Sequence, residues 1–286
     1  MDERNFLVSI ACRLDNELIP TIENMMLMAD DWSKIDVLVY NQDEESTMFK
    51  QTNFDSNVTL VNVNHIHTRN LSQARYIAQA FTKPSHEYYM CIDAHTRFDK
   101  GWDTIVKQAV DGYEGKCVIT AYPPTYSHKD GKGNNDLHSF NKPLSISQFI
   151  QSGGAKIEEG IDYRKSLFAG GYHATKIDWL YDIGYDPYID WQFHEIELSL
   201  RSYTHGYDIV NYKHTPLYHN YTHENRKKQQ PILNNYHIHG GERIYGKIMK
   251  ANMTFMEHKF PLGEERTLEQ FDEEYGISLT DWLYLS

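Results

Sequence analysis

Short apolar segments alternate with segments of helical periodicity over the first 121 residues, and this alternation is the strongest constraint on the fold. The apolar segments have the length of strands, while the segments between them repeat apolar residues every three or four positions. Strands joined by helices form a largely parallel sheet with crossover connections. The predicted strands span residues 5–13, 34–42, 58–64, 88–93 and 117–121, and the predicted helices begin near residues 21, 70 and 102.

Capping signals locate two helix starts. Asn70 is followed by Gln73 three residues later, which is the arrangement of a capping box. Asp190 is a candidate cap for a helix that runs to Arg201 and turns Phe193, Ile196 and Leu200 inward.

The rest of the chain has weaker patterns. Residues 125–160 are rich in Gly, Asn, Lys, Ser and His and have no clear period, so we interpret them as a surface excursion in preference to a substrate lid. Residues 242–253 are expected to be helical, and the acidic segment 264–274 is expected to be solvated. We predict one domain over residues 1–235 and a C-terminal helical extension over residues 236–286 that packs on it.

Composition favours a cytoplasmic protein. The three cysteines, Cys12, Cys91 and Cys117, lie in apolar strand-like segments and are expected to be reduced core residues. No apolar stretch reaches membrane length, and residues 6–12 are too short for a signal peptide. The net charge of −12 opposes broad electrostatic binding to nucleic acid.

The strand that ends at Asp93 carries the main functional signal. Asp93 and His95 are two residues apart, so an extended chain turns both side chains to the same face. They lie at the carboxyl end of a strand, where open α/β sheets bind their ligands. One carboxylate and one imidazole suit a divalent cation such as Mn²⁺, and such a cation can hold a diphosphate. The alternative is a strand end with two solvated polar residues.

An ordered set of short segments resembles glycosyltransferase family 60 and, more distantly, the polypeptide N-acetylgalactosaminyltransferases. The resemblance covers roughly residues 5–225, and it is carried by Ile10-Ala-Cys-Arg13-Leu-Asp15, Thr21-Ile22, Asn41-Gln42, Ala74-Arg75-Tyr76, Asp93-Ala-His95-Thr-Arg97-Phe98, Trp102-Asp103, Thr120-Ala-Tyr-Pro-Pro124, Phe168-Ala-Gly170, Tyr185-Asp-Pro187, Ser199-Leu-Arg201, Thr204-His-Gly-Tyr-Asp208 and His219. It implies a GT-A fold, a Rossmann-like and mostly parallel sheet flanked by helices. It also implies a nucleotide-sugar donor, most often a UDP-sugar, a divalent cation, and retention at the anomeric carbon.

The chain departs from this family just before the Ser199-Leu-Arg201 segment. Members of the family carry Gly-Glu-Glu there, and this chain carries Phe193-His194-Glu195, so that Glu195 alone matches. Because the region faces donor sugar and acceptor in the family, the sugar and the acceptor both stay open.

The resemblance implies roles for individual residues. Asp93, His95 and His219 match the metal ligands, and Mn²⁺ or Mg²⁺ is the expected ion. The expected catalytic residues are these three with His194 and Glu195, while the donor-binding candidates are Arg13, Asp15, Gln42, Arg75 and Gly170. Trp191 and Glu197 are candidates for contact with the acceptor or the sugar.

Several of these roles have structural alternatives. Asp15 accepts from the nucleotide or caps a helix turn, and Arg75 pairs with phosphate, holds the shape of the site or is a surface cation. Gly170 permits close backbone approach in a sugar-binding loop or in an ordinary turn. His194 acts as a neutral hydrogen-bond partner or as a base.

Three further motifs are interpreted without assigning them a function. Arg226-Lys227-Lys228 is expected to be solvated, and it would hold an anion only if its loop flanks the site. His65-x-His67 and His237-x-His239 have the spacing of zinc ligands but lack cysteine or carboxylate partners nearby.

The sequence therefore predicts a metal-dependent retaining glycosyltransferase that moves a sugar to a hydroxyl of a protein. A second hypothesis keeps this chemistry and takes a modified DNA base such as 5-hydroxymethylcytosine as acceptor. A third hypothesis is a non-catalytic protein that binds a sugar or a nucleotide, and a metal hydrolase is more distant. Neither the sugar nor the oligomeric state follows from the sequence.

Overall fold

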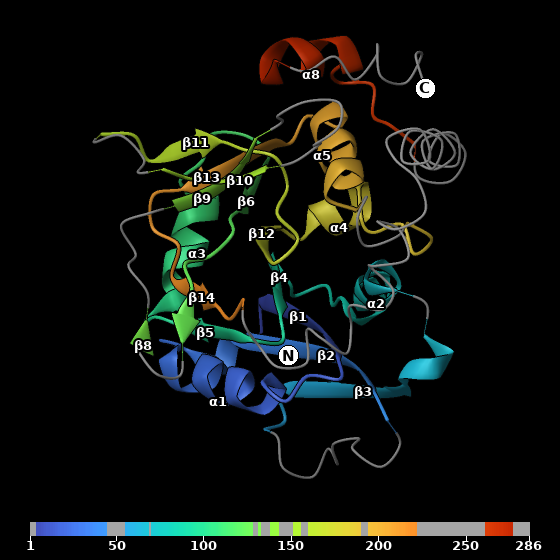
Figure 1. The fold of residues 1–286 in the computed structure, drawn as a ribbon, viewed down its shortest axis with the longest axis vertical. Coiled ribbons are helices and arrows are strands. Elements are labelled where there is room, and N and C mark those ends of the chain that lie inside the picture. Colours follow the sequence, from blue (N-terminus) through green and yellow to red (C-terminus); the bar gives the residue numbers. More distant parts are fainter. Residues whose placement is uncertain are drawn as a thin grey trace.

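The protein is seen in a computed structural model that describes residues 4–44, 55–68, 70–127, 131–132, 138–142, 151–155, 160–189, 194–221 and 261–276. Its centre is an eight-stranded mixed sheet with the strand order β11-β13-β6-β12-β4-β1-β2-β3 (Figure 1). The strands are β1 (Phe6–Arg13), β2 (Ile35–Asp43), β3 (Val58–Asn64), β4 (Tyr88–Asp93), β6 (Cys117–Thr120), β11 (Tyr163–Lys165), β12 (Tyr172–Lys176) and β13 (Asp208–Tyr212).

The parallel half of the sheet is built from β3, β2, β1 and β4. All nine residues of β2 are buried, as is typical of a strand covered on both faces. The antiparallel strand β12 lies between β4 and β6, while β13 runs parallel to β6 and β11 antiparallel to β13. The carboxyl ends of β1, β2 and β4 therefore meet at one edge of the sheet, which is the edge that carries Asp93.

Helices cover the two faces of the sheet, each above its own buried cluster. On one face, Leu18, Ile22 and Met25 of α1 and Trp102 and Val106 of α3 pack on the inward side chains of β1 and β4. The opposite face is covered by Trp179 and Leu180 of α4 and Leu198 of α5, and α2 lies against β1 and β2. The α-helices in the described part of the chain are α1 (Leu18–Met28), α2 (Leu71–Ala78), α3 (Trp102–Asp111), α4 (Asp178–Asp182), α5 (His194–Thr204) and α8 (Leu268–Tyr275).

Four small strands complete a part of the chain for which no regular structure was predicted. They are β7 (Tyr126–Ser127), β8 (Gly131–Lys132), β9 (His138–Lys142) and β10 (Gln151–Ala155), and they form two antiparallel pairs. The prediction of a surface excursion over residues 125–160 did not include these strands, which are too short for their alternation to be visible in the sequence. Another pair joins β5 (Thr96–Phe98) to β14 (Leu217–His219) and matters for the site.

The start of α2 agrees with its predicted cap, and the start of α1 differs from prediction. The Asn70 side chain accepts a hydrogen bond from the Gln73 N–H at 2.8 Å, so that predicted cap is confirmed. In contrast, α1 begins at Leu18, three residues before the predicted start at Thr21. The Thr21 hydroxyl instead donates to the carbonyl groups of Ala94 and Thr96. Asp190 and Phe193 lie outside the described residues, and Ile196 and Leu200 are buried as predicted.

The acidic segment 264–274 is mostly exposed to solvent, as predicted, and Phe271 is its one buried residue. It contains α8, which begins with a reciprocal capping box between Thr267 and Gln270 and ends at Gly276 in the left-handed region. Phe271 is 2% exposed and its ring lies 5.1 Å from that of Tyr203 on α5. Phe271 thus anchors a short helix that carries four acidic residues. The predicted helix over residues 242–253 lies outside the described residues.

Replacing Phe271 with alanine is expected to weaken the docking of α8 by about 3 kcal/mol, because a buried aromatic side chain is removed. Amide hydrogen exchange over residues 268–275 should then speed up strongly. Glu273→Ala on the exposed side of the same helix is the matched control. Equal exchange in both variants would contradict the packing of α8 on α5.

Candidate active site

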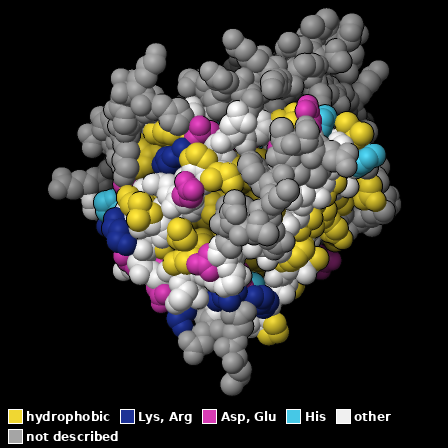
Figure 2. All heavy atoms as spheres, turned by 90° about the horizontal axis from the view of Figure 1, so that it is seen from below, with side chains coloured by type: hydrophobic (Ala, Val, Ile, Leu, Met, Phe, Trp, Pro, Cys, Tyr) yellow, Lys and Arg dark blue, Asp and Glu magenta, His cyan; other side chains and the backbone are white. Residues whose placement is uncertain are grey.

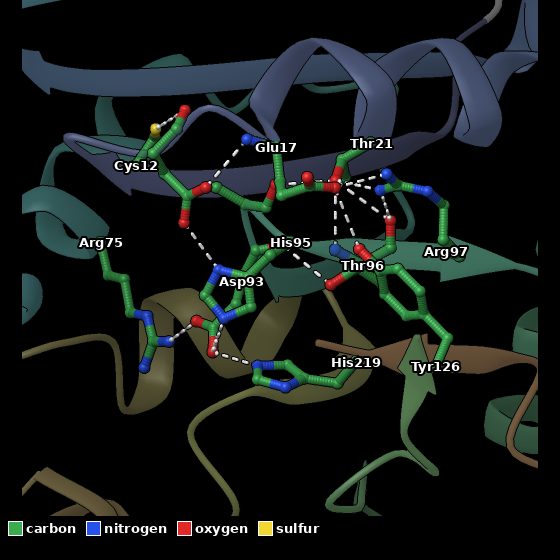
Figure 3. Close-up of polar contacts among 12 residues, drawn as sticks. Cys12, Glu17, Thr21, Arg75, Asp93, His95, Thr96, Arg97, Tyr126 and His219 are labelled. Carbon is green, nitrogen blue, oxygen red and sulfur yellow. Dashed lines mark hydrogen bonds and ion pairs between the residues drawn. The ribbon is translucent and has the colours of Figure 1, made fainter. Parts of the chain in front are cut away.

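Two short strands bring the three predicted metal ligands together. Asp93 is the last residue of β4, and His95 follows in the turn into β5. The strand β14 pairs with β5 so that His219 lies opposite Thr96, one residue from His95 (Figure 3). The His219 backbone N–H donates to Pro124 O at 2.9 Å, and the Asn220 N–H donates to His95 O at 3.0 Å. Backbone pairing thus fixes His219 beside a strand end more than a hundred residues earlier.

The ligand atoms of Asp93, His95 and His219 all lie within 4.8 Å of one another, which makes the cluster compact enough for one cation. The His219 Nε2 lies 3.0 Å from Asp93 Oδ2, and the His95 Nε2 lies 4.0 Å from the same oxygen. The two imidazole rings meet edge to face with their centroids 4.4 Å apart. One carboxylate and two imidazoles are a donor set that suits Mn²⁺ and leaves positions for substrate oxygens.

Asp15 orients His95. Its Oδ2 lies 2.7 Å from His95 Nδ1 and its Oδ1 accepts from the Glu17 N–H at 2.9 Å. A carboxylate only accepts, so the hydrogen of the neutral ring lies on Nδ1 and Nε2 presents its lone pair towards Asp93. The chain reaches this position through Leu14, which has a φ of +49°. A left-handed leucine costs free energy, and residues of this kind gather at functional sites.

The electrostatics of the cluster favour a cation. Burial raises the pKa of Asp93, but the hydrogen bond from His219 and the charges of His219, His95 and Arg75 outweigh it and hold the pKa well below its usual range. Burial lowers the pKa of His95, but Asp15, Asp93 and Glu17 outweigh this effect and raise it. The carboxylate is therefore ionised, and surroundings that attract a proton to His95 also attract a metal ion.

Arg75 lies beneath the cluster, not on its surface. Its side chain is 1% exposed, its Nη2 donates to Gly170 O at 2.5 Å, and the same nitrogen lies 3.5 Å from Asp93 Oδ1. The guanidinium therefore approaches the Asp93 carboxylate from the side away from His219, as Figure 3 shows.

Gly170 and Glu195 lie side by side next to Arg75. The Gly170 N–H donates to Glu195 Oε1 at 2.6 Å, and Tyr122 donates its hydroxyl to the same carboxylate at 2.8 Å. Burial raises the pKa of Glu195, although the bonds from Gly170 and Tyr122 offset part of the effect. His194 is 4% exposed and packs against Gly170, since a side chain there would meet its Nε2 at 2.3 Å.

The remaining predicted residues are spread over two places. Arg13 and Gln42 face each other at the carboxyl ends of β1 and β2. Gln42 is 2% exposed, and its Oε1 has no hydrogen-bond partner among the described residues. Glu197 is buried and pairs with Arg201 at 2.5 Å, so its carboxylate is held within the core beneath α5. Trp191 lies outside the described residues.

Sequence reasoning missed four residues around the site. Glu17, Arg97 and Tyr126 form a linked group beside His95, in which Arg97 Nη2 lies 2.5 Å from Glu17 Oε2 and its guanidinium lies 4.9 Å from the Tyr126 ring centroid (Figure 3). Tyr122 stands within the segment Thr120-Ala-Tyr-Pro-Pro124, which was noticed but not assigned a role. Arg97 stands in the segment Asp93-Ala-His95-Thr-Arg97-Phe98 without an assigned role, and Glu17 and Tyr126 have no motif that would single them out.

Other predicted metal and anion motifs gain no support from the described residues. There, Asp93, His95 and His219 form a possible metal cluster, and His65 and His67 join no such group. Arg226-Lys227-Lys228 and His237-x-His239 lie outside the described residues. On the face in Figure 2, the described Lys and Arg side chains form small separate groups among hydrophobic and acidic ones. No helix in the described part of the chain is long and apolar enough to cross a membrane.

Solved structures with a similar fold come from S. aureus TarS. TarS 1-349 matches with a TM-score of 0.49 at 9% identity over 76% of this chain and 60% of that chain, and its complex with UDP-GlcNAc matches with 0.48 at 11% over 76% and 59%. A further TarS structure matches with 0.50 at 8% over 97% of this chain and 46% of that one. The chain thus spans less than two thirds of each TarS chain. No curated protein matches it in a sequence search.

The predicted fold class, an α/β fold with a mostly parallel sheet flanked by helices, is confirmed. Residues 44–281, most of the chain, match the family model described as glycosyltransferase (GlcNAc). The chain belongs to this family.

Proposed function

We propose that the protein is a metal-dependent retaining glycosyltransferase that moves a sugar from a UDP-sugar to a hydroxyl of a protein acceptor. The observation that carries this proposal is the convergence of Asp93, His95 and His219, with Asp15 setting the ring tautomer of His95. The family description and the TarS complex with UDP-GlcNAc favour N-acetylglucosamine as the sugar. Within glycosyltransferases, the ordered motifs favour family 60 and a distant relation to the polypeptide N-acetylgalactosaminyltransferases.

Different residues would bind different parts of the donor. Asp93, His95 and His219 would hold Mn²⁺ or Mg²⁺, which when bound neutralises the charge of the departing diphosphate. Gln42 would offer a buried acceptor to the nucleotide beside Arg13, and Gly170 would allow its backbone to approach the sugar. His194 and Glu195 lie against that loop and are the candidates that orient sugar and acceptor, together with Trp191 and Glu197.

We place the protein in the cytoplasm, because Cys12, Cys91 and Cys117 are free and buried. We also propose that residues 1–235 are the glycosyltransferase domain and that residues 236–286 are an extension. The docking of α8 on α5 supports the second part.

A thermal-shift series tests donor and cation together. In the presence of Mn²⁺, UDP-GlcNAc at a concentration of about one hundred times its own Kd is expected to stabilise the protein by about 2.7 kcal/mol. The shift should disappear with a chelator and should be smaller with GDP-mannose. A UDP-GlcNAc shift that is equal with Mn²⁺ and with chelator would rule out the cation site.

Acceptor and catalysis need a second measurement. Hydroxylated peptide and 5-hydroxymethylated DNA are each incubated with protein, Mn²⁺ and UDP-GlcNAc, and the products are weighed by mass spectrometry. A modified peptide supports the proposal, and modified DNA overturns its acceptor. Binding of donor with neither transfer nor hydrolysis would favour a non-catalytic binding protein.

A further inference from the structure

The dipeptide Gly170–Gly171 is held from three sides between the cation cluster and the start of α5. Arg75 donates to the Gly170 carbonyl oxygen, and the Gly170 N–H donates to Glu195 Oε1. The Asp93 N–H donates to the Gly171 carbonyl oxygen at 3.3 Å. The same two residues therefore contact both the metal carboxylate and α5.

Close approach explains why both positions are glycine. A Cβ on Gly170 would lie 2.3 Å from His194 Nε2 and 3.1 Å from Glu195 Oε1. A Cβ on Gly171 would lie 3.3 Å from Asp93 Oδ2, the oxygen that faces both histidines. The dipeptide thus lies close to the Asp93 carboxylate, and a displacement of the dipeptide changes the packing around that carboxylate.

Arg75 is placed to hold this dipeptide. Within the described part of the chain, its Nε and Nη1 have no hydrogen-bond partner, and both atoms are buried. The Arg75 side chain is 1% exposed. Its polar contacts are the Gly170 carbonyl and Asp93, so its charge and its hydrogen bond both act on the geometry of the ligand carboxylate.

Tyr122 anchors the other side. Its hydroxyl lies 2.8 Å from both carboxylate oxygens of Glu195, one of which also accepts from Gly170. Removing this hydroxyl leaves the carboxylate with fewer donors and free to rotate away from the Gly170 N–H.

We propose that Arg75, Glu195 and Tyr122 form a clamp on Gly170–Gly171 that sets the position of Asp93 and thereby the affinity for the divalent cation. In this arrangement Arg75 and Tyr122 are positioning residues, and the cation site senses the packing at the start of α5. The proposal rests on the cation site of the proposed function.

The clamp is tested first without metal. Amide exchange at Gly170 is measured by NMR in the metal-free protein and is expected to be about fivefold faster in Tyr122→Phe, the effect of losing one hydrogen bond. Tyr113→Phe is the matched control, because it removes a hydroxyl that donates to Asp208 at 2.8 Å on a remote edge of the sheet. Equal exchange at Gly170 in Tyr122→Phe and the unsubstituted protein would overturn the clamp, whatever the metal does.

Cation affinity is measured second, by Mn²⁺ titration without donor. Tyr122→Phe is expected to bind Mn²⁺ about fivefold more weakly, and Arg75→Lys about tenfold more weakly. The loss of Mn²⁺ affinity in the double variant should be smaller than the product of the two single losses, because both substitutions loosen the same dipeptide. Unchanged Mn²⁺ affinity in both single variants overturns the proposal. Absence of Mn²⁺ binding in the unsubstituted protein instead overturns the cation site, and Gly170 exchange still decides the clamp.

Discussion

Replacing Asp93 with asparagine is expected to lower kcat/KM for sugar transfer by about 10³-fold or more. A bound cation contributes several kcal/mol of charge stabilisation to the departing diphosphate, and a loss of about 4 kcal/mol corresponds to about 10³-fold in rate. Asparagine is close in shape to aspartate but is neutral, so it weakens the cation site without opening a cavity. The rate with UDP-GlcNAc and Mn²⁺ and the Mn²⁺ affinity should fall together.

The same substitution removes a partner of Arg75. The buried guanidinium lies 3.5 Å from Asp93, and a buried charge that loses its counter-charge destabilises the fold. Melting temperature is therefore measured alongside activity, and rates are compared at a temperature where both proteins are folded. Asp162→Asn is the control, since Asp162 pairs with exposed Lys213 away from the site.

A folded Asp93→Asn protein that transfers sugar within tenfold of the unsubstituted rate would contradict the metal assignment. So would an unchanged dependence on Mn²⁺. An unchanged rate together with an unchanged requirement for cation would mean that the cation binds elsewhere in the chain.

The sheet was predictable because strand periodicity is local. The predicted strand over residues 58–64 has the observed bounds, and those over residues 5–13 and 88–93 differ by one residue or none. The start of α1 was predicted three residues late, at Thr21, whose hydroxyl donates to the carbonyl groups of Ala94 and Thr96 just after β4. Those groups lie more than seventy residues away, and no local pattern records them.

The site was predictable only in part for the same reason. Asp93 and His95 follow from a two-residue spacing at a strand end. Their proximity to His219 depends on the pairing of β14 with β5, and the sequence indicated it through resemblance to a family alone. Tyr122 and Gly171 act through contacts with Glu195 and Asp93 that join distant segments, so their neighbourhood became visible only in the fold.

Asp15→Asn is expected to weaken Mn²⁺ binding by about 10- to 100-fold, as is typical when a residue that orients a metal-bound histidine is changed. In the native protein Asp15 Oδ1 accepts from the Glu17 N–H and Oδ2 accepts from His95. The asparagine carbonyl oxygen is expected to keep the backbone N–H, because the amide nitrogen cannot accept it. The amide nitrogen then faces His95 Nδ1 and donates to it.

A donor at this position reverses the tautomer of His95. The ring hydrogen moves to Nε2, and Nε2 loses the lone pair that would bind the cation. Asp15→Ala removes the same charge but leaves the ring free to choose its tautomer, so it should bind Mn²⁺ more tightly than Asp15→Asn. ¹⁵N NMR of the His95 ring reports the tautomer directly, and Asp55→Asn, which faces Trp32 at the surface, is the control. Equal affinities in the asparagine and alanine variants would mean that Asp15 acts through its charge, and the tautomer argument would fail.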